Sequence, residues 1–172
     1  ATTEIYTLSL HDALPIYLGV LLLFACESTP IYQNTVTLTD HAWPAEELLN
    51  FSFQVQDTAQ LYDIYLVVNN TQAYPYQNLY ITYYLEDATQ ALCNSELKNY
   101  PLFEAKTGKP LGKGWGKVKS HALIVLQGHH FSCPGWYTFK LAQFMRTEAL
   151  TGLQAVGIKV THAAKQSGKA TS

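Results

Sequence analysis

The sequence contains few charged residues, and the two signs are almost balanced. Asp, Glu, Lys and Arg make up 14% of the 172 residues, and the formal net charge is -2. Glu4 and Asp12 are the only charged residues before position 26, so the rest of the chain carries 11 basic and 11 acidic residues. A surface without excess positive charge has no electrostatic attraction for a phosphate backbone. We therefore expect no nucleic-acid partner.

The chain also lacks the patterns that catalysis and cofactor binding require. The glycine-rich segment 112–117 (GKGWGK) lacks the spacing of a phosphate-binding loop, and Lys117 stands where the third glycine of a dinucleotide-binding turn would be. The carboxylates are scattered, and no spacing brings two of them together for glycoside hydrolysis. His129 and His130 are adjacent, so on a strand they would point to opposite faces and could not both join Cys133 around a metal ion. We expect no enzymatic activity, no cofactor and no metal site.

Aromatic residues are abundant, at 13% of the chain with 12 Tyr, and this composition favours sheets. Apolar and polar residues alternate with a period of two in 50–56, 61–69 and 79–86, as in half-buried strands. We expect further strands at 33–39, 91–96, 121–126, 134–145 and 153–160, with turns or loops at 40–44, 69–77, 107–117 and 147–152. These short strands predict a single all-β domain, an antiparallel, jelly-roll-like β-sandwich over 33–161, followed by a disordered tail at 162–172.

An apolar run at 17–26 (YLGVLLLFAC) ends in Ala25 and Cys26. It is shorter than the about 20 residues that a membrane-spanning helix needs, and it resembles the end of a bacterial lipoprotein signal peptide. We expect cleavage after Ala25 and lipidation of Cys26, which leaves 26–32 as a lipidated tether. No Lys or Arg precedes the run, although a signal peptide should begin with them. Residues 1–16 instead match the translation of a short-read sequencing adapter, so we interpret them as an artefact joined to a truncated signal peptide at 17–25.

Three further side chains are candidates for covalent modification. Cys93 and Cys133 are the thiols that remain once Cys26 is lipidated, and in an oxidising compartment they are candidates for a disulfide. Such a bond requires their Cα atoms to lie within about 7 Å of each other, which sequence alone does not show. Residues 57–59 (DTA) match the Asp-Ser/Thr-aliphatic pattern that resembles an O-glycosylation site of Bacteroidota envelope proteins, with Thr58 as the acceptor. The alternative is that Asp57 hydrogen-bonds the backbone of its own turn.

Several motifs resemble the gliding-motility lipoprotein family GldH, in the same order along the chain. In the first half they are 55–58 (VQDT), 62–65 (YDIY) and 74–80 (YPYQNLY). In the second half they are 108–114 (GKPLGKG) and 143–146 (QFMR), followed by Leu150 and Gly152. The resemblance covers 26–160. The chain departs from the family at 69–70 (NN), where Arg-Asn is expected, and at 129–133.

The resemblance implies an N-terminally lipidated envelope protein of Bacteroidota without catalytic residues. It also implies partners among the envelope proteins of the gliding machinery and its linked secretion apparatus, and it leaves the oligomeric state open. No acidic cluster of the kind that resembles a surface-export signal follows Cys26. We therefore expect an anchor in the outer membrane, with the domain facing the periplasm.

Two uses of the exposed surface remain open. If 74–78 and 112–116 lie side by side, Tyr74, Tyr76, Asn78, Lys113 and Trp115 would form a surface for protein partners. The alternative is a glycan-binding sandwich, in which Tyr74, Tyr76, Tyr80 and Tyr84 form an aromatic platform for sugar rings. Aromatic residues of antiparallel sheets also serve as core or cross-strand pairs. The solvent exposure of these tyrosines distinguishes the alternatives.

Overall fold

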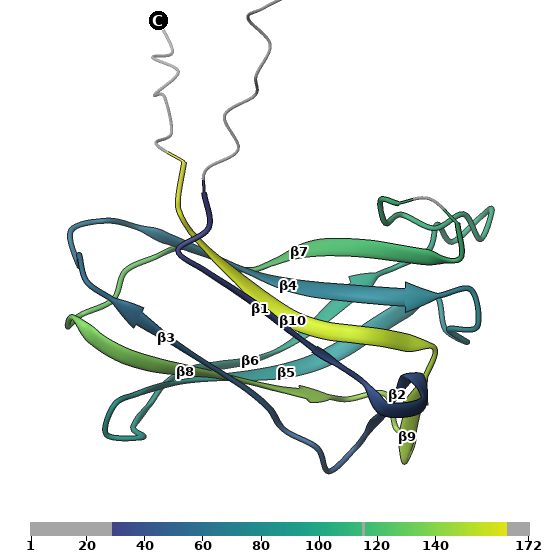
Figure 1. The fold of residues 1–172 in the computed structure, drawn as a ribbon, viewed down its shortest axis with the longest axis horizontal. Helices are drawn as coiled ribbons and strands as arrows, with labels where there is room; N and C mark the ends of the chain where they lie inside the picture. Colours follow the sequence, from purple (N-terminus) through teal and green to yellow (C-terminus); the bar gives the residue numbers. More distant parts are fainter. Residues whose placement is uncertain (1–28, 115, 165–172) are drawn as a thin grey trace, which may run out of the picture.

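The computed structural model describes residues 29–114 and 116–164, which form two packed antiparallel sheets of four strands each (Figure 1). One sheet has the strand order β1-β10-β4-β7 and the other has the order β3-β8-β5-β6, while β2 and β9 form a separate pair. The prediction of a single-domain, all-β antiparallel sandwich is confirmed. The elements are β1 (Tyr32–Thr37), the 3-10 helix η1 (Thr39–His41), β2 (Ala42–Pro44), β3 (Leu49–Val55), β4 (Tyr62–Thr71), β5 (Asn78–Asp87), β6 (Leu92–Pro101), β7 (Val118–His129), β8 (Gly135–Gln143), β9 (Ala149–Thr151) and β10 (Leu153–His162).

The interior is filled by the apolar residues that alternate along the strands. β3 buries its apolar side chains at every second position and exposes Asn50, Ser52 and Gln54 between them. Across the same sheet, Tyr83 of β5 stacks on Phe139 of β8, with 5.1 Å between the ring centroids. Aromatic pairs of this kind add stability beyond the area that they bury. The alternation seen in the sequence therefore sets which face of each strand points into the core.

Two segments expected to be a turn and a loop contain strands instead. The 40–44 segment holds the end of η1 and β2, and the 147–152 segment holds β9. Trp43 lies opposite Leu150 in this small pair, and both side chains are fully buried. The indole Nε1 of Trp43 donates a hydrogen bond to the backbone oxygen of Glu47 at 3.0 Å. Burial of a large aromatic residue with its polar atom satisfied thus makes a core element out of a segment that resembles a turn.

Both ends of the domain leave the sandwich on the same side (Figure 1). Tyr32 of β1 pairs with Val160, and His162, the last residue of β10, pairs with Tyr62. We call this the termini end. The opposite, distal end holds β9, residues 72–77 and residues 144–148. No helix in the described part of the chain is long and apolar enough to cross a membrane. The predicted artefact, the signal region, Cys26 and residues 165–172 of the predicted tail lie outside the described residues.

Candidate functional site

The structure places Tyr74 below the predicted partner surface, which is a correction to that prediction. Its side chain is only 5% exposed and stacks on Phe103, with 6.3 Å between ring centroids and 11° between ring planes. Its hydroxyl donates to the backbone oxygen of Asn78 at 2.8 Å, and burial raises the pKa of Tyr74. Tyr74 thus anchors the 72–77 segment from inside. It contributes neither to a partner surface nor to a four-tyrosine platform for sugars.

The two segments predicted to lie side by side are joined through a third. The backbone oxygen of Gln77 accepts hydrogen bonds from the amides of Leu102 and Phe103, at 2.9 and 3.0 Å. The oxygen of Leu102 in turn accepts from the amide of Leu111 at 2.9 Å. Lys113 is exposed beyond this contact, Asn78 is half-buried, and Trp115 lies outside the described residues. The five predicted residues therefore do not form a single surface.

A buried polar pair fixes the 112–114 segment against β7. His121 Nε2 lies 2.9 Å from Asn70 Oδ1, and the Asn70 amide nitrogen donates to the Thr71 oxygen at 3.0 Å. Since that bond makes Oδ1 the acceptor, Nε2 carries the proton, as in a neutral imidazole. Gly112 packs directly on the ring, and a Cβ added there would lie 2.6 Å from Nε2. The neutral His121 ring is therefore part of the structure under the Lys113 segment.

Because His121 is buried as a neutral ring, we predict that the folded domain becomes less stable at acidic pH. Burial lowers the pKa of His121 below its ordinary value of 6.5, so the unfolded chain takes up a proton first as the pH falls. The stability conferred by neutral His121 is present above pH 6.5 and declines as the pH falls through the folded-state pKa. Replacing His121 by Gln should flatten the dependence of Tm on pH between pH 8 and 5. Burial also lowers the pKa of His129, so Tm of the His121→Gln variant should still fall slightly as the pH falls. The exposed control His41→Gln should keep the wild-type profile; a similar flattening in both variants would contradict the assignment.

The distal end carries an exposed groove that the sequence did not reveal. Its volume is about 520 Å³, and we call it the distal groove. Three of its walls are aromatic, and Phe144 is the most exposed of them at 55%. Leu97 of β6 is 48% exposed beside it. The lining residues are Tyr76, Tyr80, Leu97, Phe144, Met145 and Arg146. A concentration of exposed apolar side chains in one concave surface is typical of an interaction site.

The turn after β8 holds Phe144 in this exposed position. The Phe144 amide donates to the Tyr80 oxygen at 2.9 Å, and the Tyr80 amide lies 3.1 Å from Met145 Sδ. Gln143, which is only 5% exposed, accepts from the Met145 amide at 2.8 Å and donates to the Thr147 oxygen at 2.9 Å. The buried amide thus organises the turn from below. Phe144 then projects outward as a consequence of this fixed backbone.

Arg146 gives the groove a single positive charge. The ion pairs found among the described residues join Lys98 to Glu96 and Lys140 to Glu86. Arg146 has no carboxylate partner within that part of the chain. No group of three or more His, Cys, Asp or Glu side chains in the described residues is arranged to hold a metal ion. The groove can therefore offer apolar contact and one cation, but it presents no nucleophile and no carboxylate.

Of the predicted modification sites, the structure describes Cys93 near the start of β6, Cys133 between β7 and β8, and Thr58 after β3. Cys93 and Cys133 are exposed free thiols that line one depression of about 610 Å³, and burial raises the pKa of Cys93. A disulfide between them stays an open possibility. Asp57 Oδ1 accepts from the Ala59 amide at 2.8 Å, so the carboxylate supports its own turn. Thr58 is half-buried in that turn, and its glycosylation also stays a prediction.

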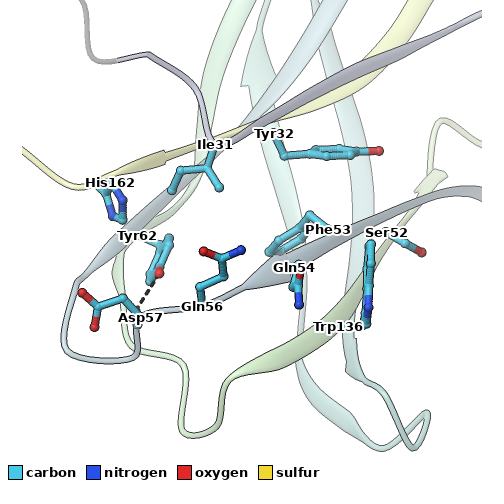
Figure 2. A pocket seen from close by; sticks show the side chains of 10 residues that line it. All are labelled: Ile31, Tyr32, Ser52, Phe53, Gln54, Gln56, Asp57, Tyr62, Trp136 and His162. Carbon is cyan, nitrogen blue, oxygen red and sulfur yellow. Dashed lines mark hydrogen bonds between the residues drawn. The ribbon is translucent and has the colours of Figure 1, made fainter.

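A second cavity lies at the termini end, where it follows the edge strand β3 and is lined by residues from both faces of that strand (Figure 2). Its volume is about 430 Å³, and we call it the Trp136 cavity after the indole on its wall, which is 56% exposed. Figure 2 shows Tyr62, Asp57 and His162 on one side, Trp136 and Ser52 on the other, and Gln54 and Gln56 between them. The sequence did not reveal this site, because its residues come from five separate strands, from Ile31 before β1 and from the turn after β3. Only the exposed Trp136 within a strand could have indicated it.

Comparisons with known proteins agree with the motif resemblance. A sequence profile described as GldH lipoprotein matches residues 30–160. The chain is 26% identical over 153 residues to the "Gliding motility lipoprotein GldH homolog" of Christiangramia forsetii, covering 84% of this chain and 92% of that protein. It is 22% identical over 150 residues to the "Gliding motility lipoprotein GldH" of Flavobacterium johnsoniae, covering 83% and 91%.

Solved structures provide a weaker likeness. The VP2 subviral particle of infectious bursal disease virus is 12% identical, with a TM-score of 0.37, and the match covers 77% of this chain and 32% of the viral chain. The Gx strain of that virus gives 12% identity, a TM-score of 0.38 and coverage of 81% and 34%. These scores are too low to carry any inference about this protein. The sequence match, in contrast, spans nearly the whole described domain, and the chain therefore belongs to the GldH lipoprotein family.

Proposed function

We propose that the protein is a non-catalytic, lipid-anchored assembly component of the gliding machinery and its linked secretion apparatus, and that the distal groove docks a protein partner. One observation carries the proposal. The segments 74–80 and 143–146, which carry much of the resemblance to GldH, are 63 residues or more apart in sequence but contribute five of the six groove residues. Segments that a family shares and that meet on the surface point to a common binding role.

The chemistry of the groove defines the partner that fits it. Tyr76, Tyr80 and Phe144 offer aromatic contact area of the kind that dominates binding energy in protein interfaces. Arg146 would be left without an ion pair unless the partner supplies one, and a carboxylate matches its forked donors. We therefore infer a partner segment with aliphatic or aromatic side chains and one Asp or Glu. The groove is too open and too poor in polar groups to favour a small charged ligand.

The start of β1 lies at one end of the sandwich, and the 72–77 and 144–148 segments, which carry most of the groove residues, lie at the other (Figure 1). From Cys26 to Tyr32 the chain can span at most about 22 Å, because each of the six steps extends no more than about 3.6 Å. A lipid on Cys26 would therefore hold the termini end close to the bilayer and present the distal groove away from it. We place the anchor in the outer membrane with the domain in the periplasm. Mass spectrometry should find fatty acyl chains on Cys26 as the first residue, and residues 17–25 still attached to a bare thiol would refute the anchor.

Replacing Phe144 by Ala tests the docking groove. The full chain, crosslinked in the native envelope, should recover identified gliding or secretion proteins, and Phe144→Ala should lower that recovery by about tenfold or more, as expected for a central aromatic contact. Ile124→Ala is a matched control, since Ile124 is 39% exposed on β7 of the other sheet. Arg146→Glu should also weaken recovery by reversing the charge. Equal recovery with all three variants, or only a lone monomer from the wild type, would overturn the proposal.

A further inference from the structure

We propose that the Trp136 cavity binds an uncharged saccharide. Trp136 is 56% exposed, and it lies directly opposite Gln54 in the pairing of β8 with β3. An exposed indole on rigid strands offers a flat, electron-rich face, which suits the C–H face of a sugar ring. The four-tyrosine platform expected from the sequence does not form, since Tyr74 is buried. The aromatic surface suited to a sugar lies at the other end of the domain.

Unused polar groups surround the indole. Neither Gln54 nor Gln56 makes a side-chain hydrogen bond within the part of the chain that the structure describes, and both are exposed toward the cavity (Figure 2). Each amide carries two N–H donors and one carbonyl acceptor. Sugar hydroxyls both donate and accept, so neighbouring hydroxyls can satisfy both sides of one amide. The Ser52 hydroxyl, 3.1 Å from that of Thr138, adds a further donor and acceptor beside them.

The charges of the cavity favour an uncharged ligand over an anionic one. No Lys or Arg lines it, and Asp57 contributes a carboxylate. One oxygen of Asp57 accepts from the Ala59 amide at 2.8 Å, while the other has no hydrogen bond among the described residues and can accept from a hydroxyl. A phosphate or carboxylate ligand would therefore meet repulsion from Asp57, with no Lys or Arg to compensate for it. The volume of about 430 Å³ falls in the range of about 300–1,000 Å³ that is usual for small-ligand sites.

The position of the cavity leaves two sources for such a sugar. Ile31 and His162, next to the two ends of the described domain, line it, so it lies on the side from which the anchor would emanate. The saccharide could belong to a glycolipid head group in the adjacent membrane or to a glycan that is free of lipid. The recognising chemistry is the same in both cases. The site is at the far end from the distal groove and does not depend on it.

The test is a titration of the full chain in detergent with maltotriose, cellotriose and N,N′,N″-triacetylchitotriose, and a parallel binding assay on phosphatidylcholine vesicles with and without a neutral glycolipid. We expect saturable binding to at least one saccharide or glycolipid. Trp136→Ala should weaken it by about tenfold or more, and Trp136→Phe should retain part of it. Gln54→Ala and Gln56→Ala should each weaken it severalfold. Since Trp136 is exposed, the Tm of its variants should stay close to that of the wild type.

Phe144→Ala serves as the control, because it alters the distal groove and should bind sugar as the wild type does. Binding to the free oligosaccharides supports a glycan source, and binding only to the glycolipid vesicles supports a head group. Absence of saturable binding in both assays would overturn the proposal. So would equal affinity of the wild type and Trp136→Ala, since the sugar would then be bound elsewhere. Loss of partner recovery by Phe144→Ala with intact sugar binding would separate this site from the docking groove.

Discussion

Replacing Gly157 by Ala is expected to detach β1 from the edge of its sheet and to destabilise the domain by about 3 kcal/mol or more, at the upper end of the cost of overpacking. Gly157 lies in the middle of β10, directly opposite Thr35 of β1. A Cβ at this position would lie 2.0 Å from the backbone oxygen of Asn34 and 2.6 Å from the Cα of Thr35. Both are backbone atoms, so no change of rotamer can relieve the overlap. β1 must move away and lose its pairing with β10.

Thermal unfolding measures this effect, with Gly128→Ala as the control. For a domain of this size, 3 kcal/mol corresponds to a fall in Tm of about 10 °C. Gly128 is also in a strand, and a Cβ added there meets nothing within 4 Å, although its φ of +59° is costly for Ala. Gly128→Ala should therefore cost only about 1 kcal/mol. A larger loss of stability from Gly128→Ala than from Gly157→Ala would show that the approach of β1 to β10 does not restrict position 157.

The strands could be predicted from the sequence where one face is buried and the other is exposed to solvent. β3 and β5 have strict alternation, so their bounds in the structure differ from the expected 50–56 and 79–86 by one residue. β2 and β9 are three residues each, too short for any period to show. Their stability comes from Trp43 packing on Leu150, a contact across more than 100 residues. A tertiary contact of this kind leaves no local pattern in the sequence.

The candidate sites were harder to predict than the fold because exposure depends on turns. Tyr74 and Tyr76 are two residues apart in one polar segment, yet the first is buried on Phe103 and the second lines the distal groove. Phe144 resembles the continuation of β8, but Gln143 ends the strand and turns Phe144 outward. Trp136 fits the alternation of β8, so the sequence predicts its place in a strand but no role in a cavity. Sequence periodicity identifies a face, and only the partner strands decide whether that face lines a cavity.

The conformation of the distal groove depends on Gly152, and replacing this residue by Ala is expected to impair both stability and docking. Gly152 has a φ of +82°, in the region that disfavours residues with a Cβ. Its oxygen accepts from the Thr71 amide at 2.8 Å, which fixes the start of the 72–77 segment. A Cβ would lie 2.4 Å from the Cα of Tyr74. The backbone that carries Tyr74 and Tyr76 must therefore shift when position 152 gains a methyl group.

The free energy of unfolding from urea titration and the recovery of crosslinked partners should respond together. Strain at positive φ costs about 1–2 kcal/mol and overpacking adds about 1–3 kcal/mol, so Gly152→Ala should lose about 3 kcal/mol. Gly108→Ala separates the two causes: its φ is +67°, and nothing lies within 4 Å of the added Cβ. The free energy of unfolding of Gly108→Ala should fall only by the cost of the positive φ, and this variant should recover partners as the wild type does. If Gly152→Ala instead matches Gly108→Ala in both measurements, the close contact with Tyr74 does not shape the groove, and partner binding must rest on Phe144 and Arg146 without support from the 72–77 segment.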